Sequence, residues 1–138
     1  RCSVRMPFDP HPAFYFLNEK KMKICVIEDS KSIKALLGYI LRIARYEVEC
    51  YEDGEIAIKE IKKNHPDLIL TDYHMSKMTG HELMLQLLSE FPDIPIIVVT
   101  SDTKIISKED LMTREKVSWI IKPFNEEILL AAIENKIK

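Results

Sequence analysis

The sequence predicts an α/β protein in which a parallel β-sheet is covered by helices on both faces. Short apolar runs alternate along the chain with segments of helical period, which is the pattern of repeated βαβ units. The apolar runs at 24–27, 68–70 and 96–99 are nearly continuous and mostly β-branched, as expected for strands that are buried on both faces. Right-handed crossovers then place successive strands in one parallel sheet.

Five strands are expected, each at one of the apolar runs. In chain order the predicted strands are 23–28, 46–51, 67–72, 94–100 and 117–121. The intervals between them are long enough for one helix each, and a fifth helix follows the last strand. The first helix is predicted from one apolar face with helical spacing, formed by Ile33, Leu36, Leu37, Ile40, Leu41 and Ala44.

The remaining helices are predicted from capping residues and from the same apolar spacing. Asp29 or Ser30 begins the first helix, Asp53 the second and Asn125 the fifth, because short polar side chains cap helix N-termini. The third helix is indicated by Leu83, Met84, Leu87 and Leu88, and the fifth by Ile128, Leu129, Ala132 and Ile133.

Length and composition exclude several classes of protein. The 138 residues suffice for one domain with one sizeable core. Lys and Arg number 20 against 22 Asp and Glu, so the formal charge of −2 offers no electrostatic footprint for nucleic acid or an anionic membrane. The apolar stretches are far shorter than the roughly 20 residues of a spanning helix. An apolar fraction of 46% excludes a disordered chain.

The cysteines and the first 21 residues bear on location and domain boundaries. Cys2, Cys25 and Cys50 are widely spaced and form no CxxC pair, so we expect reduced thiols in a cytoplasmic protein rather than a metal or redox site. Residues 1–21 are rich in proline and aromatic residues, and they do not form a signal peptide. Residues 1–21 are either a leader foreign to the protein or a native extension. The folded domain is expected over residues 22–138.

Polar side chains stand at the carboxyl ends of four predicted strands. In such sheets ligands bind at these ends. The residues are Glu28, Asp29, Asp72, Thr100 and Lys122. Each alone has a plainer explanation, as a helix cap, a turn or a strand residue. Together, three carboxylates that repel one another favour a hard cation such as Mg²⁺. A carboxylate beside such an ion and a lysine can accept a phosphoryl group, because both cations offset the charge of the transferred oxygens.

The same residues, with their neighbours, resemble the receiver domain of two-component response regulators over residues 22–138. The matching segments are Glu28-Asp29, Asp72-Tyr73-His74-Met75, Gly80, Thr100-Ser101 and Lys122-Pro123-Phe124. Asp29, Asp72, Thr100 and Lys122 are separated by 43, 28 and 22 residues. The resemblance implies a flavodoxin-like, doubly wound sheet of five parallel strands in the order 2-1-3-4-5, with five helices.

The resemblance also implies a role for each residue of the cluster. Asp72 is the phosphoacceptor. Mg²⁺ is held by Asp29, Asp72 and the main-chain carbonyl of His74, and Glu28 acts through a metal-bound water. The residues expected to bind the phosphoryl oxygens are Thr100 and Lys122, with the main-chain N–H groups of Tyr73 and Ser101. Trp119 takes the place of the switch aromatic residue, and the Lys122–Pro123 peptide bond is expected to be cis.

Four departures from the family pattern are expected to matter. Ser76 replaces a common proline, which predicts a looser loop after Asp72. Glu28 replaces a frequent aspartate and lengthens the reach to the metal-bound water. Arg114-Glu115-Lys116 stands where a Gly-Ala pair usually precedes strand five. Trp119 is bulkier than the usual Tyr or Phe, so an inward rotamer requires repacking.

The resemblance implies a phosphorylation-controlled signalling module rather than a metabolic enzyme. Its expected partners are a sensor histidine kinase or phosphotransfer protein and a downstream protein target, with a homodimer through the fourth helix, strand five and fifth helix as a further option. The alternative is a binding scaffold of receiver fold that does not switch. A Mg²⁺-dependent phosphohydrolase is disfavoured, because His74 stands where such an enzyme has its second aspartate.

Overall fold

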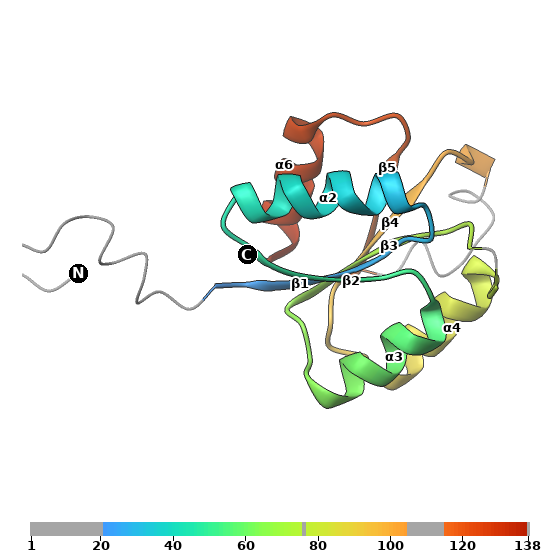
Figure 1. Ribbon diagram of the computed structural model, residues 1–138. Coiled ribbons are helices and arrows are strands. Elements are labelled where there is room, and N and C mark those ends of the chain that lie inside the picture. Colours follow the sequence, from blue (N-terminus) through green and yellow to red (C-terminus); the bar gives the residue numbers. More distant parts are fainter. Residues whose placement is uncertain (1–20, 76, 105–114, 138) are drawn as a thin grey trace, which may run out of the picture.

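The computed structural model describes residues 21–75, 77–104 and 115–137. These residues form one sheet of five parallel strands in the order β2-β1-β3-β4-β5 (Figure 1), which confirms the expected topology. The strands lie close to their predicted positions: β1 (Lys23–Ile27), β2 (Glu47–Tyr51), β3 (Leu68–Asp72), β4 (Ile96–Thr100) and β5 (Val117–Ile121).

Helices cover both faces of the sheet. Helices α2 (Lys31–Ile43) and α6 (Glu126–Ile137) lie on one face, and α3 (Gly54–Lys63) and α4 (Gly80–Glu90) lie on the other (Figure 1). The central strands β1, β3 and β4 are buried at every position. Because successive strand residues point to opposite faces, each strand contributes to two cores. Ile24, Val26, Leu68 and Leu70 pack with α2 and α6, whereas Cys25, Ile27, Ile69 and Val98 pack with α3 and α4.

Side-chain caps fix where the helices begin. Ser30 caps α2, and Asp53 accepts from the N–H groups of Glu55 and Ile56 at the start of α3. The Asn125 side chain accepts from Ile128 N–H at 2.8 Å at the start of α6. Helix α4 begins with a reciprocal capping box between Thr79 and Glu82. Helices α2, α3 and α6 start just beyond the carboxyl end of the strand that precedes them, whereas a longer loop separates β3 from α4.

Some expectations fall on residues that the structure does not describe. The helix expected between β4 and β5 falls largely on 105–114, so four helices are seen in the described residues. Ser76, Arg114 and residues 1–20 also lie outside the described ranges. Within those ranges, no helix combines the length and the apolar character needed to cross a bilayer.

Candidate functional site: a carboxylate cluster at the carboxyl ends of the strands

The candidate site lies across four neighbouring strands. Glu28 and Asp29 follow β1, Asp72 ends β3, Thr100 ends β4 and Lys122 follows β5. These strands are consecutive in the sheet, in the order β1-β3-β4-β5. Backbone hydrogen bonds continue to the edge of the site, because Lys122 N–H donates to the Thr100 carbonyl at 2.8 Å. The sheet therefore brings together residues that are far apart in the sequence.

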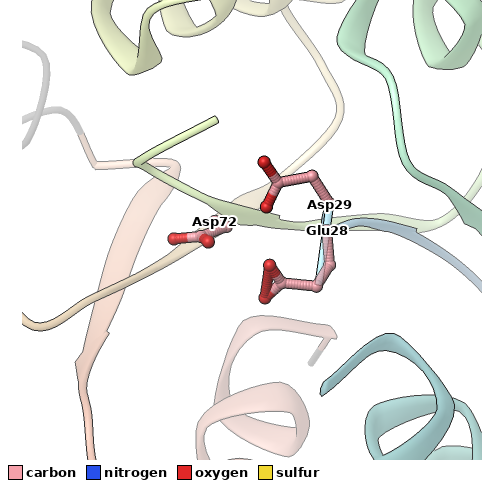
Figure 2. Close-up of side chains that lie close together, drawn as sticks. All are labelled: Glu28, Asp29 and Asp72. Atoms are coloured by element: carbon pink, nitrogen blue, oxygen red, sulfur yellow. The ribbon is translucent and has the colours of Figure 1, made fainter. Parts of the chain in front are cut away.

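The three carboxylates form a compact cluster. One oxygen from each of Glu28, Asp29 and Asp72 lies within 4.8 Å of the others. Figure 2 shows the side chains gathered at the ends of the strands, with Asp29 above, Glu28 below and both carboxylates on the side of Asp72. Glu28 is 2% exposed and Asp72 is 8% exposed, whereas Asp29 is half-buried. Like charges this close, and this far from water, need compensation.

The pKa of Glu28 reflects the missing compensation. The pKa of this carboxyl is raised from 4.5 to about 7, first by burial and then by the hydrogen bond and the negative charge of Asp72. The positive charge of Lys122 and the N–H of Ser30 act in the opposite direction. A group that holds its proton to neutral pH in the metal-free protein marks a site that is short of positive charge.

Lys122 supplies part of that positive charge. Its Nζ lies 3.5 Å from Asp72 Oδ2 and 3.8 Å from Glu28 Oε1. The Lys122–Pro123 peptide bond is cis, the isomer that the resemblance implies. When all three carboxylates are ionised, one ammonium leaves the cluster with two negative charges. This deficit and the hard oxygen donors fit a divalent cation such as Mg²⁺.

Thr100 is fully buried beside the cluster. Its Oγ1 accepts a hydrogen bond from Asp102 N–H at 3.0 Å. A hydroxyl that accepts in this way keeps its own hydrogen for donation to another oxygen. Ser101, the next residue, is exposed.

The loop after Asp72 differs in one respect from the expected arrangement. The N–H of Tyr73 was expected to face a bound phosphoryl group, but it donates to the Val99 carbonyl at 3.1 Å as a continuation of the sheet. The N–H of His74 faces the site instead and donates to Asp72 Oδ1 at 3.3 Å. No feature of the sequence indicates this exchange, because it depends on the path of the main chain.

Trp119 lies on β5, next to the site rather than in it. Its side chain is 41% exposed, and its register partner on β4 is Val98, two residues before Thr100. The structure therefore places the expected switch residue near Thr100 with its ring toward solvent.

The comparisons with known proteins agree with the fold. The model of the response regulator receiver domain family matches residues 24–134. Probable transcriptional regulator ycf27 of Porphyridium aerugineum is 33% identical over 86% of this chain and 49% of its own length. Transcriptional regulatory protein RprY of Bacteroides fragilis is 34% identical over 84% of this chain and 49% of its own length. The chain thus spans about half the length of these curated relatives.

Solved structures give the same answer. Chemotaxis response regulator CheY4 of Vibrio cholerae has a TM-score of 0.75 and 30% identity, over 85% of this chain and 99% of its own. Response regulator TrrA of Thermotoga maritima, solved in complex with Mg²⁺-BeF, has a TM-score of 0.75 and 25% identity, over 83% of this chain and 98% of its own. With the family match, the strand order and the acidic cluster in agreement, the chain belongs to the response regulator receiver domains of two-component signalling.

Proposed function

We propose that this receiver domain is phosphorylated on Asp72 by a phosphohistidine donor in a Mg²⁺-dependent reaction. The observation that carries the proposal is the cluster of three carboxylates facing Lys122 at the carboxyl ends of the strands. We place the domain at residues 22–138, with 1–21 outside it, in line with the family match over 24–134. The free thiols of Cys25 and Cys50 support a cytoplasmic location.

In this proposal the cation is held by oxygen donors alone. Asp29 and Asp72 provide side-chain oxygens, His74 provides its main-chain carbonyl, and Glu28 acts through a bound water. When bound, Mg²⁺ would neutralise charge on the carboxylates and on the transferred phosphoryl oxygens. Removing charge from the cluster would also lower the pKa of Glu28, so that all three carboxylates are ionised together.

The residues of the chain have separate roles in the transfer. A carboxylate oxygen of Asp72 attacks phosphorus while the phosphorus–nitrogen bond of the donor breaks, and the donor imidazole leaves with the electron pair. The Lys122 ammonium lies 3.5 Å from Asp72 and offsets the charge of the phosphoryl oxygens. The Thr100 hydroxyl and the N–H groups of His74 and Ser101 donate to the same oxygens. Hydrolysis later breaks the bond between phosphorus and Asp72 oxygen, so the domain acts only on its own phosphoryl group.

The direct test is labelling by acetyl phosphate. We expect the protein to gain one phosphoryl group with Mg²⁺ and almost none with EDTA, because the uncompensated cluster repels an anionic donor. The bond should survive acid and be cleaved by alkali or hydroxylamine, as an acyl phosphate is. Intact-mass measurement reads out the gain. A protein that binds Mg²⁺ but stays unlabelled would support the non-switching scaffold instead.

The output of the switch is proposed to involve Thr100 and Trp119. A phosphoryl group on Asp72 adds acceptor oxygens, which draw the buried Thr100 hydroxyl toward the site. This movement leaves space for Trp119 to turn inward, and the surface around β5 and α6 changes for a downstream protein partner. Second copies of the chain are candidates for that partner.

Trp119 is also the means to test the switch, because it is the only tryptophan. We expect beryllofluoride with Mg²⁺, which mimics the phosphoryl group, to reduce acrylamide quenching of its fluorescence as the ring leaves solvent. Thr100→Ala should weaken this response. An unchanged quenching profile, with beryllofluoride binding shown by ¹⁹F NMR, would exclude Trp119 as the switch residue.

A further inference from the structure

Gly80 lies unusually close to the loop that follows the acceptor Asp72. It is the first residue of α4, directly after the Thr79 cap. A Cβ on Gly80 would lie 2.0 Å from the Tyr73 carbonyl oxygen, and 2.7 and 2.8 Å from two atoms of the Tyr73 ring. The nearest of these atoms belongs to the main chain, so no side-chain rotation relieves the contact. Gly80 is thus required where α4 meets the residue after Asp72.

The carbonyl that contacts Gly80 belongs to the peptide group that faces the acceptor. The Tyr73 C=O and the His74 N–H are the two ends of one peptide plane, and they point in opposite directions. The N–H end donates to Asp72 Oδ1 at 3.3 Å. Tyr73 itself is also held in place, because its own N–H donates to the Val99 carbonyl on β4. Any displacement of the carbonyl therefore tilts the N–H away from the Asp72 carboxylate.

We infer that Gly80 is a positioning residue, which orients the Tyr73–His74 peptide so that its N–H faces Asp72. Only a residue without a side chain allows α4 to begin this close to the Tyr73 carbonyl. A Cβ would force the peptide to move by about 1.4 Å, because the contact of 2.0 Å must reach an ordinary distance of about 3.4 Å. The effect of that movement on phosphorylation rests on the proposed function, whereas the effect on the peptide itself does not.

The other two glycines provide matched controls. A Cβ on Gly38, in α2, would lie 2.8 Å from the tip of the flexible Arg42 side chain, which can move aside. A Cβ on Gly54, the first residue of α3, would lie 3.1 Å from a methyl group of Leu83. Alanine is a better helix former than glycine, so helix propensity alone predicts stabilisation at all three sites. Only Gly80→Ala should disturb the acceptor loop.

The first measurement is amide hydrogen exchange by NMR on the metal-free protein. In the wild type we expect the His74 amide to be protected, and in Gly80→Ala its protection should fall about tenfold, which reports loss of the hydrogen bond to Asp72. Gly38→Ala should leave it unchanged. If Gly80→Ala does not fold, hydrogen exchange of the wild-type protein still tests the inference. A His74 amide that exchanges freely in the wild type would overturn it.

The second measurement is the rate of labelling by acetyl phosphate with Mg²⁺. Gly80→Ala should be slower by about a hundredfold, since a displacement of about 1 Å at a reacting centre has effects of that order. The double variant Gly80→Ala/Tyr73→Ala should remain slow, because the contact with the main-chain oxygen persists. Recovery in the double variant would assign the effect to the ring and overturn the inference.

The two measurements separate this inference from the proposed function. Failure of the wild type to accept a phosphoryl group would refute the proposed function. The hydrogen exchange of the His74 amide would still test the role of Gly80. A folded Gly80→Ala protein with wild-type His74 protection and wild-type labelling would refute the role of Gly80 alone.

Discussion

Asp72→Asn is expected to abolish labelling by acetyl phosphate, with a loss of at least about a thousandfold in the initial rate. The amide nitrogen and oxygen of Asn cannot form the acyl phosphate, although the side chain has almost the same shape. Because one negative charge is removed from the cluster, the variant should fold at least as stably as the wild type without metal. Intact-mass measurement over a time course in acetyl phosphate and Mg²⁺ gives the rate.

The control for this variant is Asp93→Asn. Asp93 is exposed, and it precedes β4 and so lies at the opposite edge of the sheet from the cluster. The Asp93→Asn protein should be labelled at the wild-type rate, because the same chemical change is made outside the site. Labelling of Asp72→Asn at a comparable rate would show that another residue accepts the phosphoryl group.

Glu28→Gln is expected to stabilise the metal-free protein above pH 7. The pKa of Glu28 in the folded state is about 7, whereas that of a glutamate exposed to water is 4.5, because the carboxyl is buried beside Asp72. The ionised form therefore costs up to about 3 kcal/mol in the folded state. Glutamine has similar size and no charge, so we expect a gain of about 2–3 kcal/mol in the free energy of unfolding at pH 8, measured by urea unfolding in EDTA.

The pH dependence identifies the cause of this gain. A carboxyl whose pKa is raised on folding holds its proton more tightly in the folded state, so wild-type stability falls as the pH rises from about 4.5 to about 7 and is then constant. Well below pH 4.5 the Glu28 carboxyl is protonated in both the folded and the unfolded state, so the advantage of glutamine should disappear there. An equal difference between Glu28→Gln and the wild type at pH 5 and pH 8 would contradict the account.

Much of the fold could be predicted because the central strands are buried on both faces. The continuous apolar runs that mark β1, β3 and β4 exist because both sides of those strands pack against helices. Asp53 and Asn125 cap helices as expected. These caps could be predicted because short side chains with an acceptor oxygen are preferred at helix N-termini. The Thr79 cap also has a sequence signal, a threonine three residues before Glu82.

The main-chain part of the site could not be predicted in the same way. The cluster of side chains follows from strand ends, which parallel topology places at one edge of the sheet. The direction of the Tyr73 and His74 N–H groups depends on how the chain turns after Asp72. Likewise, a glycine in the sequence does not reveal that its Cα lies against the Tyr73 carbonyl. Such features need coordinates, because every residue has the same main-chain groups.

The most direct test of the central claim is to locate the phosphoryl group chemically. Borohydride reduces an aspartyl phosphate to homoserine, so protein labelled by acetyl phosphate, reduced and digested can be mapped by peptide mass spectrometry. We predict homoserine at position 72 and at no other aspartate, only in samples that contained Mg²⁺. Homoserine at Asp29 instead, or a phosphoryl group recovered on the exposed His74, would contradict the assignment of Asp72 as the acceptor.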